Sequence, residues 1–223
     1  MASPSVEDYI KAIYKARLET GVVSTQDLAA RVQVSAAAVS KMLKRLTQLR
    51  LADHTPYHGV RLSETGEKMA LEIIRHHRLL ELYLVQALGY GWDEVHAEAE
   101  RLEHHISEEF EDRIDALLGH PTSCPHGDPI PTREGVMAAI SSHTLAQQRL
   151  PAQLTIRRVR DEDAELLRHL KALGLLPGTG IEFVEQEPFG GAFLVRVGGE
   201  VVRVAPRAAE QIFVGIEPEI SSP

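Results

Sequence analysis

One predicted helix places an imidazole and a carboxylate on the face that its hydrophobic spacing assigns to the protein core. Residues 63–88 carry apolar side chains at helical spacing, and the same stripe contains His77 and Glu81. The apolar members of this stripe are Met69, Ile73, Leu80, Leu84 and Leu88. Because a buried carboxylate without a partner is costly, the fold must bring a compensating group to this helix. A divalent cation is one such group.

A second predicted helix offers four metal-ligand side chains on one side. His96, Glu100, Glu103 and His104 fall within about 100° of the helix circumference. Each of these residues, taken alone, is more simply explained as a solvated or hydrogen-bonded side chain. Together with His77 and Glu81 they form a set at i, i+3 and i+4 spacing on two neighbouring helices, which favours a metal site between the helices.

An enzyme with a carboxylate-bridged pair of metal ions on a helical bundle is an alternative interpretation. Such centres repeat their Glu and His motif on two helices, whereas here Glu100 with Glu103 and His104 occurs once. The sequence also shows no Ser/His/Asp grouping, phosphate loop or reactive-cysteine setting. We therefore expect a protein that is not an enzyme and takes no organic substrate.

The first 70 residues carry the pattern of a DNA-binding head. Ser24 and Ser35 are candidate N-caps of two short helices that meet across a tight turn, and two short strands around a Pro and Gly turn follow in 51–63. This is the winged helix-turn-helix pattern, whose second helix enters the major groove. The residues expected to face DNA are Ser35, Ala37, Ser40, Lys41, Lys44 and Arg45. An ordinary helical bundle is the alternative, but its surface would seldom combine a basic cluster with such small residues.

Charge is distributed unevenly along the 223 residues. The net charge of −8 divides into +3 for residues 1–70, −9 for 71–145 and −2 for the remainder. A basic head suits phosphates, while an acidic middle suits cations and repels DNA. We expect a DNA-binding domain at 1–70, a helical metal-binding domain at 71–145 and a small β-barrel at 150–218, where strand periodicity dominates.

The chain has no stretch close to the roughly 20 apolar residues of a membrane span, and its start lacks the apolar core of a secretion signal. We therefore expect a cytoplasmic protein. Its single cysteine, Cys124, excludes an intrachain disulfide and any zinc cluster of several cysteines. Cys124 has His126 nearby and could ligate a metal, but an isolated thiol in a loop is usually structural, and that is our expectation for Cys124.

The order of these features resembles the diphtheria toxin repressor family. The resemblance rests on the winged head, the segments HHRLLE and EVHAEAERLEHHISEE, the loop PTSCPHGDPIP and the terminal barrel, and it covers nearly the whole chain. It implies a mainly α protein with a small β domain, built from a winged helix-turn-helix, a helical dimerisation domain and a C-terminal SH3-like barrel. It also implies a homodimeric, metal-activated repressor of metal-uptake genes that binds a palindromic operator in double-stranded DNA.

The resemblance assigns the candidate ligands to two metal sites, with two ions per subunit. One site contains His77, Glu81 and His96. The other contains Asp8, Glu100, Glu103 and His104. Asp8, which the head supplies, is singled out by the resemblance alone. The barrel adds three candidate carboxylates, namely Asp161, Glu162 and Asp163.

Two positions indicate the metal. This chain has Asp8 and Glu100 where iron-responsive members carry Met and Cys, as manganese-responsive members do. Hard oxygen ligands suit Mn²⁺, so we expect activation by Mn²⁺, with Fe²⁺ as the alternative. Lys11 stands where the manganese branch has a Glu that helps to hold a close metal pair, so two more separated sites are expected.

Other positions depart from the iron-type pattern. Those members complete one site with an anion held by an Arg, a Ser and an Asn, whereas this chain has Arg78, Cys124 and Asp128. The carboxylate of Asp128 would repel an anion. Ala37 and Lys41 replace a Pro and a Gln in the recognition helix, so a different operator is expected. A winged-helix regulator that senses an organic ligand is a further alternative, and it would bind its operator in the presence of a chelator.

Overall fold

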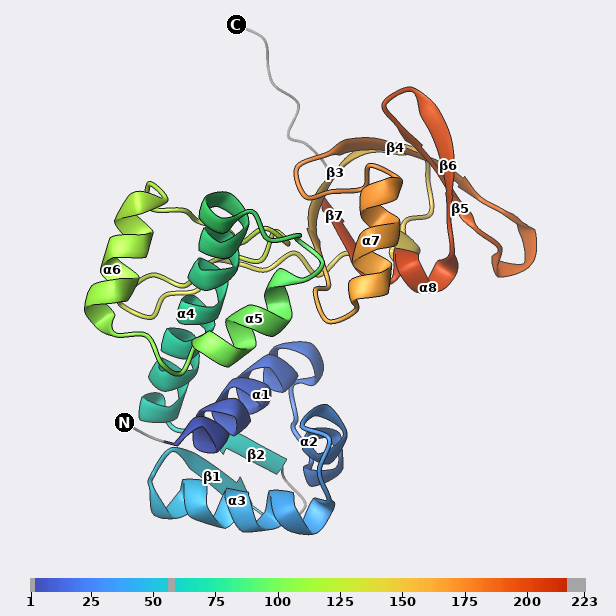
Figure 1. The fold of residues 1–223 in the computed structure, drawn as a ribbon. Coiled ribbons are helices and arrows are strands. Elements are labelled where there is room, and N and C mark those ends of the chain that lie inside the picture. The colour runs from blue at the N-terminus through green and yellow to red at the C-terminus, as the bar shows by residue number, and fades with distance from the viewer. Residues whose placement is uncertain (1–2, 56–58, 216–223) are drawn as a thin grey trace, which may run out of the picture. The chain divides into compact units, whose positions relative to one another are not determined.

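The computed structural model describes residues 3–55 and 59–215. They form two compact units, each of which combines separate stretches of the chain (Figure 1). Unit 1 comprises 1–77, 102–111 and 131–137, and unit 2 comprises 78–101, 112–130 and 138–223. Among the described residues, every helix is too short or too polar to cross a membrane.

Unit 1 begins with a winged helix-turn-helix. Its elements are α1 (Pro4–Thr20), α2 (Thr25–Arg31), α3 (Ala36–Gln48), β1 (Ala52–Thr55) and β2 (Gly59–Leu62). Both predicted caps are confirmed, because Ser24 Oγ accepts the N–H of Asp27 at 3.0 Å and Ser35 Oγ accepts the N–H of Ala38 at 3.2 Å. The strands β1 and β2 pair antiparallel and form the wing, whose turn at 56–58 lies outside the described residues.

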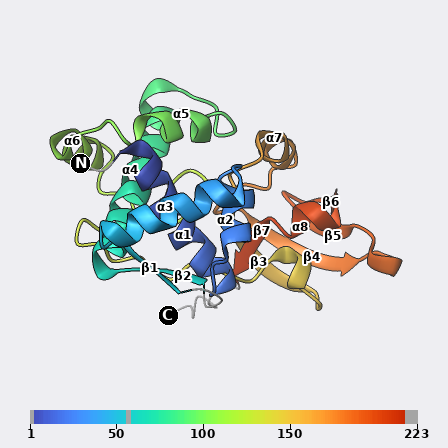
Figure 2. The same cartoon turned by 90° about the horizontal axis from the view of Figure 1, so that it is seen from below.

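The winged helix-turn-helix of unit 1, called the head below, has an apolar core. Val39, Leu43 and Leu46 are fully buried on the inner face of α3, as their i, i+4 and i+7 spacing predicts. They join buried side chains of the other helices, among them Val6, Ile10, Ile13, Leu28 and Ile74. The opposite face of α3 is left to solvent, and Figure 2 looks onto this helix with the wing beside it.

The long helix α4 (Glu64–Leu88) follows the wing. Ser63 caps it, since Ser63 Oγ accepts the N–H of Gly66 at 3.1 Å. His77 and Glu81 are 3% and 0% exposed, so the predicted burial of both polar side chains is confirmed. The prediction was wrong for Leu88, which is 57% exposed because the helix ends there.

The next helix, α5 (Val95–Leu102), is shorter than the sequence pattern predicts. The N–H of His105 bonds to the carbonyl of Leu102, and this tight turn closes the helix before Glu103 and His104. The four candidate ligands of this segment therefore do not share one helix. Helix α6 (Glu108–Leu117) comes next, followed by the irregular proline-containing loop.

The C-terminal part of unit 2 is a five-stranded antiparallel sheet with strand order β6-β5-β4-β3-β7. Its strands are β3 (Ala152–Val159), β4 (Gly180–Gln186), β5 (Phe193–Val197), β6 (Glu200–Val204) and β7 (Ile212–Gly215). The accompanying helices are α7 (Ala164–Ala172), α8 (Pro206–Ala209), η1 (Leu145–Gln147) and η2 (Pro188–Gly190). Register shifts in β3 and β4 curve the sheet, giving the expected SH3-like domain. Trp92, which precedes α5, belongs to the buried core of this domain.

Candidate metal centre and nucleic-acid interface

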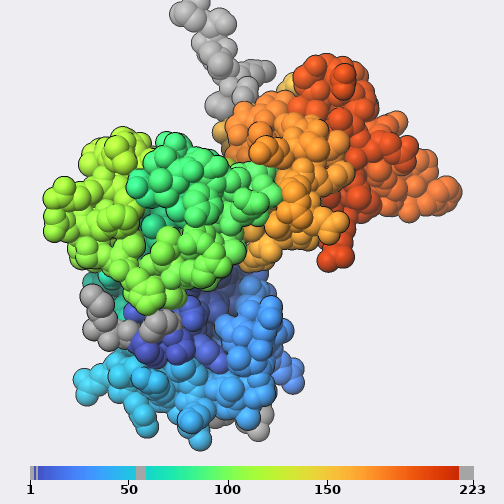
Figure 3. Space-filling model, viewed as in Figure 1, coloured from blue at the N-terminus to red at the C-terminus, as the bar shows by residue number. Residues whose placement is uncertain are grey.

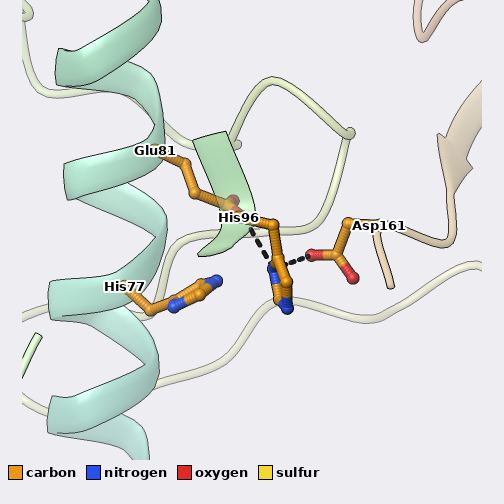
Figure 4. Close-up of side chains that lie close together, drawn as sticks. All are labelled: His77, Glu81, His96 and Asp161. Atoms are coloured by element: carbon orange, nitrogen blue, oxygen red, sulfur yellow. Dashed lines mark hydrogen bonds and ion pairs between the residues drawn. The ribbon is translucent and has the colours of Figure 1, made fainter. Parts of the chain in front are cut away.

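Three segments of unit 2 bring polar side chains together around Glu81. Glu81 lies on α4, His96 on the first turn of α5, and Asp161 in the connection between β3 and α7. His96 Nδ1 lies 3.1 Å from Glu81 Oε1 and 3.3 Å from Asp161 Oδ2. Figure 4 shows this convergence, with His77 one turn before Glu81 on α4. Two carboxylates therefore meet at one imidazole.

The pKa of His96 reflects this arrangement. Burial alone would lower the pKa, but hydrogen bonds and charge from Asp161 and Glu81 outweigh burial and raise it from 6.5 to about 10. In the metal-free chain at neutral pH, His96 is thus an imidazolium between two carboxylates. A divalent cation would supply the same positive charge, and its binding would release the proton.

The proline-containing loop brings Cys124 and His126 to the same carboxylate. One ligand atom from each of Glu81, Cys124 and His126 lies within 4.8 Å of the others, and all three residues are buried. Burial raises the pKa of the Cys124 thiol well above its usual 9.0, and the charges of Glu81 and Asp128 add to this. Although the sequence predicts a structural thiol, the structure places Cys124 beside two other potential metal ligands.

The protonation of His126 follows from its neighbours. Its Nε2 lies 2.7 Å from the backbone carbonyl oxygen of Trp92, which can only accept, so Nε2 carries a proton. Its Nδ1 lies 3.5 Å from Glu81 Oε2 and has no hydrogen-bond partner among the described residues. Burial lowers the pKa of His126, whereas Glu81 and Asp161 raise it by more. This buried nitrogen thus faces carboxylates, as a metal ligand would, and the N, O and S donors suit a divalent transition-metal ion.

Of the three acids that the barrel offers, Asp161 is the one in this cluster. Asp163 caps α7 instead, because its Oδ1 accepts the N–H groups of Glu165 and Leu166 at 3.0 and 3.1 Å. Glu162 is exposed. The resemblance does not distinguish these three acids, but the position of Asp163 directly before an amphipathic helix is a capping signal that separates it from the other two.

Asp128 anchors the loop that carries Cys124 and His126. Its Oδ1 lies 3.4 Å from Arg78 Nη2 on α4 and 3.5 Å from Arg158 Nη1 on β3. Arg78 also donates to the carbonyl of Pro129 at 2.5 Å. The guanidinium of Arg158 lies over the ring of Phe213, 3.4 Å from its centroid. The loop is therefore held by ion pairs to a helix and to the sheet.

A second cluster lies in unit 1, between α1 and the turn after α5. One ligand atom from each of Asp8, Glu103 and His104 lies within 4.8 Å of the others. His104 Nε2 is 2.9 Å from Asp8 Oδ1 and 3.4 Å from Glu103 Oε1. His104 Nδ1 is 2.6 Å from Glu7 Oε2, so the Glu7 carboxylate can accept the Nδ1 proton and leave Nε2 facing the other two carboxylates. Sequence reasoning did not single out Glu7.

Lys11 provides a buried cation in this cluster. Its Nζ lies 2.5 Å from Glu103 Oε1, and the other oxygen of Glu103 lies 2.6 Å from His77 Nδ1. Lys11 and Glu103 are only 6% and 1% exposed. Burial raises the pKa of Asp8, while His104 and Lys11 lower it by less. The ammonium group therefore occupies an oxygen that a metal ion at this cluster would use.

Two candidate ligands have contacts outside their predicted sets. His77, predicted with Glu81 and His96, hydrogen-bonds to Glu103. Glu100, predicted with Asp8, lies on α5 with its Oε1 3.7 Å from His96 Nε2. The assignment of these two residues to one site or the other stays a prediction.

The predicted DNA-contacting residues share the outer face of α3. All six, Ser35, Ala37, Ser40, Lys41, Lys44 and Arg45, are exposed. In Figure 3 the light-blue atoms of this segment form part of the surface of unit 1. The small side chain of Ala37 near the helix start leaves room for close approach to base edges, while the basic groups further along suit phosphates.

Three family models match the chain over most of its length. "Iron dependent repressor, N-terminal DNA binding domain" matches residues 1–60, "Iron dependent repressor, metal binding and dimerisation domain" matches 63–132, and "FeoA domain" matches 143–215. The chain belongs to the iron-dependent, or diphtheria toxin, repressor family. Among its relatives, this family member is 32% identical over 222 residues to the iron-dependent repressor IdeR of Mycobacterium tuberculosis, covering 94% of this chain and 96% of the relative.

Other transcriptional regulators and metal-bound repressors are also similar to this chain. MntR of Salmonella typhimurium is 38% identical over 113 residues, covering 51% of this chain and 69% of the relative. A manganese-dependent transcriptional repressor solved in complex with manganese has a TM-score of 0.87 at 38% identity, covering 94% of this chain and 98% of that one. ScaR with bound Cd²⁺ has a TM-score of 0.81 at 34% identity, covering 95% and 99%. The relatives are repressors, not enzymes, and this family member is a metal-dependent transcriptional repressor.

Proposed function

We propose that this repressor is activated by Mn²⁺, with Fe²⁺ as the alternative ion, and that it controls metal-uptake genes. In this proposal two ions per subunit hold a homodimer in the geometry that binds a palindromic operator. The observation that carries the proposal is the buried Nδ1 of His126, which faces the Glu81 carboxylate without a hydrogen-bond partner among the described residues.

The first ion would bind at Glu81. The two carboxylate oxygens of Glu81 face different histidines, since Oε1 is near His96 and Oε2 is near His126. Asp161 and Cys124 complete the donors at this carboxylate, and His77 is the further ligand that the family resemblance supplies. The buried charge of Glu81 is then balanced by the ion.

The second ion would bind between α1 and the turn after α5. Asp8, Glu103 and His104 are its nearest donors, and Glu100 is the fourth ligand that the resemblance implies. The oxygen donors support Mn²⁺, whereas the sulfur of Cys124 at the first site also suits softer ions, which keeps Fe²⁺ as the alternative.

Metal would act on DNA binding by fixing the position of α1. Asp8 lies on α1, the first helix of the DNA-binding head, while Glu103 and His104 follow α5. An ion held by all three therefore favours one position of the head's first helix within unit 1. A coupling free energy of about 1–3 kcal/mol between ion and DNA would change operator affinity by roughly 5 to 150-fold.

The dimer and the DNA surface complete the proposal. The helical segment between Ile106 and Leu118 is the proposed dimerisation surface, and it leaves Phe110 and Leu117 41% and 69% exposed in the single chain. The outer face of α3 is the proposed DNA-reading surface. A twofold dimer presents two such helices, so the operator is expected to be a palindrome with half-sites about one helical turn apart.

The proposal is tested by operator binding with and without metal. A duplex selected from a randomised library in the presence of Mn²⁺ is labelled, and its affinity is measured by fluorescence anisotropy in Mn²⁺, Fe²⁺, Zn²⁺ or chelator. Mn²⁺ should strengthen binding, and Glu81→Gln and Glu100→Ala should remove this effect while far-ultraviolet circular dichroism stays unchanged. The exposed acid Glu94 offers a matched control, because Glu94→Gln should behave as the wild type. Equal affinity in chelator and in Mn²⁺ would overturn the proposal, and an equal response to Mn²⁺, Fe²⁺ and Zn²⁺ would overturn its choice of metal.

A further inference from the structure

Trp92 contacts the imidazole of His126 in two different ways. Its backbone carbonyl accepts the Nε2 proton at 2.7 Å, and its indole stacks on the ring with the centroids 5.4 Å apart and the planes 26° from parallel. The carbonyl determines which nitrogen is protonated. The indole restricts the plane of the ring, which matters because rotation of a histidine ring about its last torsion has only a broad preference.

We propose that Trp92 is a positioning residue for His126, and that its indole keeps His126 Nδ1 directed at Glu81. This inference rests on the proposed function, since it assumes that an ion binds at Glu81. Groups that orient a metal-ligating histidine typically affect metal affinity by 10 to 100-fold, and they do so without touching the ion.

The indole is itself held by the C-terminal domain. Trp92 is 8% exposed and belongs to the same buried core as side chains of the sheet and α7. The next residue, Asp93, accepts a hydrogen bond from Arg168 on α7 at 3.2 Å. The β domain therefore contributes to the site both through the Asp161 carboxylate and through the packing that holds Trp92 against His126.

The indole N–H has no hydrogen-bond partner among the described residues, although it is buried. Its removal should therefore cost no hydrogen bond, and a phenylalanine ring should replace the indole as a stacking surface. Every substitution at this position also keeps the backbone carbonyl. Variants of Trp92 thus separate the effect of the aromatic ring from that of the carbonyl.

Co²⁺ binding provides a readout of this site alone. Cys124 is the single cysteine, and the cluster around Asp8 has no sulfur, so thiolate-to-Co²⁺ charge-transfer absorption reports only on the ion beside Cys124. Trp92→Leu and Trp92→Met should weaken Co²⁺ binding by about 10 to 100-fold, while Trp92→Phe should stay within about threefold of the wild type. If the leucine variant does not fold, the methionine variant carries the comparison.

Leu154→Ala is the matched control, because Leu154 is 2% exposed in the same core but is not a neighbour of the metal ligands in sequence. It should lower the melting temperature and leave Co²⁺ affinity within about threefold of the wild type. As a second readout, nitrogen-15 spectra of histidine-labelled, metal-free protein should show the Nε2 proton of His126 in the wild type and in every Trp92 variant, because the backbone carbonyl remains, so that a loss of Co²⁺ affinity is assigned to the ring.

Unchanged Co²⁺ affinity in the leucine or methionine variant would overturn the positioning role. Equal weakening in Leu154→Ala would also overturn it, since stability alone would then explain the loss. Absence of the thiolate band in the wild type would instead count against the first metal site, so the two failures are distinguishable.

Discussion

The affinity of the first site for Mn²⁺ should depend on pH through the thiol of Cys124. The sulfur is buried beside Glu81 and Asp128, and these surroundings raise the pKa of the thiol well above 9.0. Below pH 9 the thiol of the metal-free protein is therefore protonated, and it must lose this proton before the sulfur can bind a metal ion. Cys124→Ser removes this proton from the balance, because a serine hydroxyl does not ionise in this range.

The magnitude follows from proton linkage. Each proton released on binding strengthens the apparent Mn²⁺ affinity tenfold for every unit that the pH rises. The dissociation constant of Cys124→Ser divided by that of the wild type should therefore increase by roughly 30-fold between pH 6.5 and 8.0. His96 also releases a proton, because its pKa is about 10, but it does so in both proteins and cancels from the ratio.

Isothermal titration calorimetry in two buffers of different ionisation enthalpy counts these protons directly. The wild type should release one proton more than Cys124→Ser when Mn²⁺ fills the first site, under anaerobic conditions with a non-thiol reductant. A ratio that stays constant from pH 6.5 to 8.0, with equal proton release, would refute the reasoning that the thiolate is a ligand.

Three further predictions concern other parts of the molecule. Lys11→Met should lower the melting temperature of the metal-free protein, because Glu103 loses the ammonium group beside its Oε1, and it should increase the stabilisation by Mn²⁺ in the same thermal scan. The urea midpoint of the metal-free protein should fall as the pH rises from 6.5 to 10. The pKa of His96 is about 10 in the folded protein, so the stabilisation from its charged contacts is complete below pH 6.5 and is lost as the imidazolium deprotonates. If the urea midpoint rises over this interval, the His96 contacts are misassigned. Lys44→Ala should weaken operator binding and reduce its salt dependence by about one ion per subunit, or about two for the dimer, with Mn²⁺ affinity measured by calorimetry unchanged.

Local sequence signals predicted the elements of the head. The caps at Ser24, Ser35 and Ser63 each satisfy backbone donors within three residues, so their effect is visible in the sequence itself. The burial of His77 and Glu81 was also predictable, because helical periodicity alone places them among the apolar side chains of α4.

Contacts between segments that are distant in the sequence were harder to predict from the sequence alone. Cys124 and His126 lie in an irregular loop that has no periodicity, so nothing in their spacing indicates that the loop packs on Glu81. Lys11 was noted as a departure from the family pattern, but its burial against Glu103 depends on a contact 92 residues away. The early end of α5 was missed because a continuous helical pattern does not reveal that a tight turn after Leu102 will interrupt it.

The ion pairs of Asp128 with Arg78 and Arg158 affect which solutes can influence metal binding. A free anion in that place would make occupancy depend on the cellular level of phosphate or sulfate as well as on the metal. Here the negative group is part of the chain and cannot dissociate, since the carboxylate lies 3.4 and 3.5 Å from Arg78 and Arg158. We therefore expect the metal affinity of this repressor to be independent of the supply of inorganic anions.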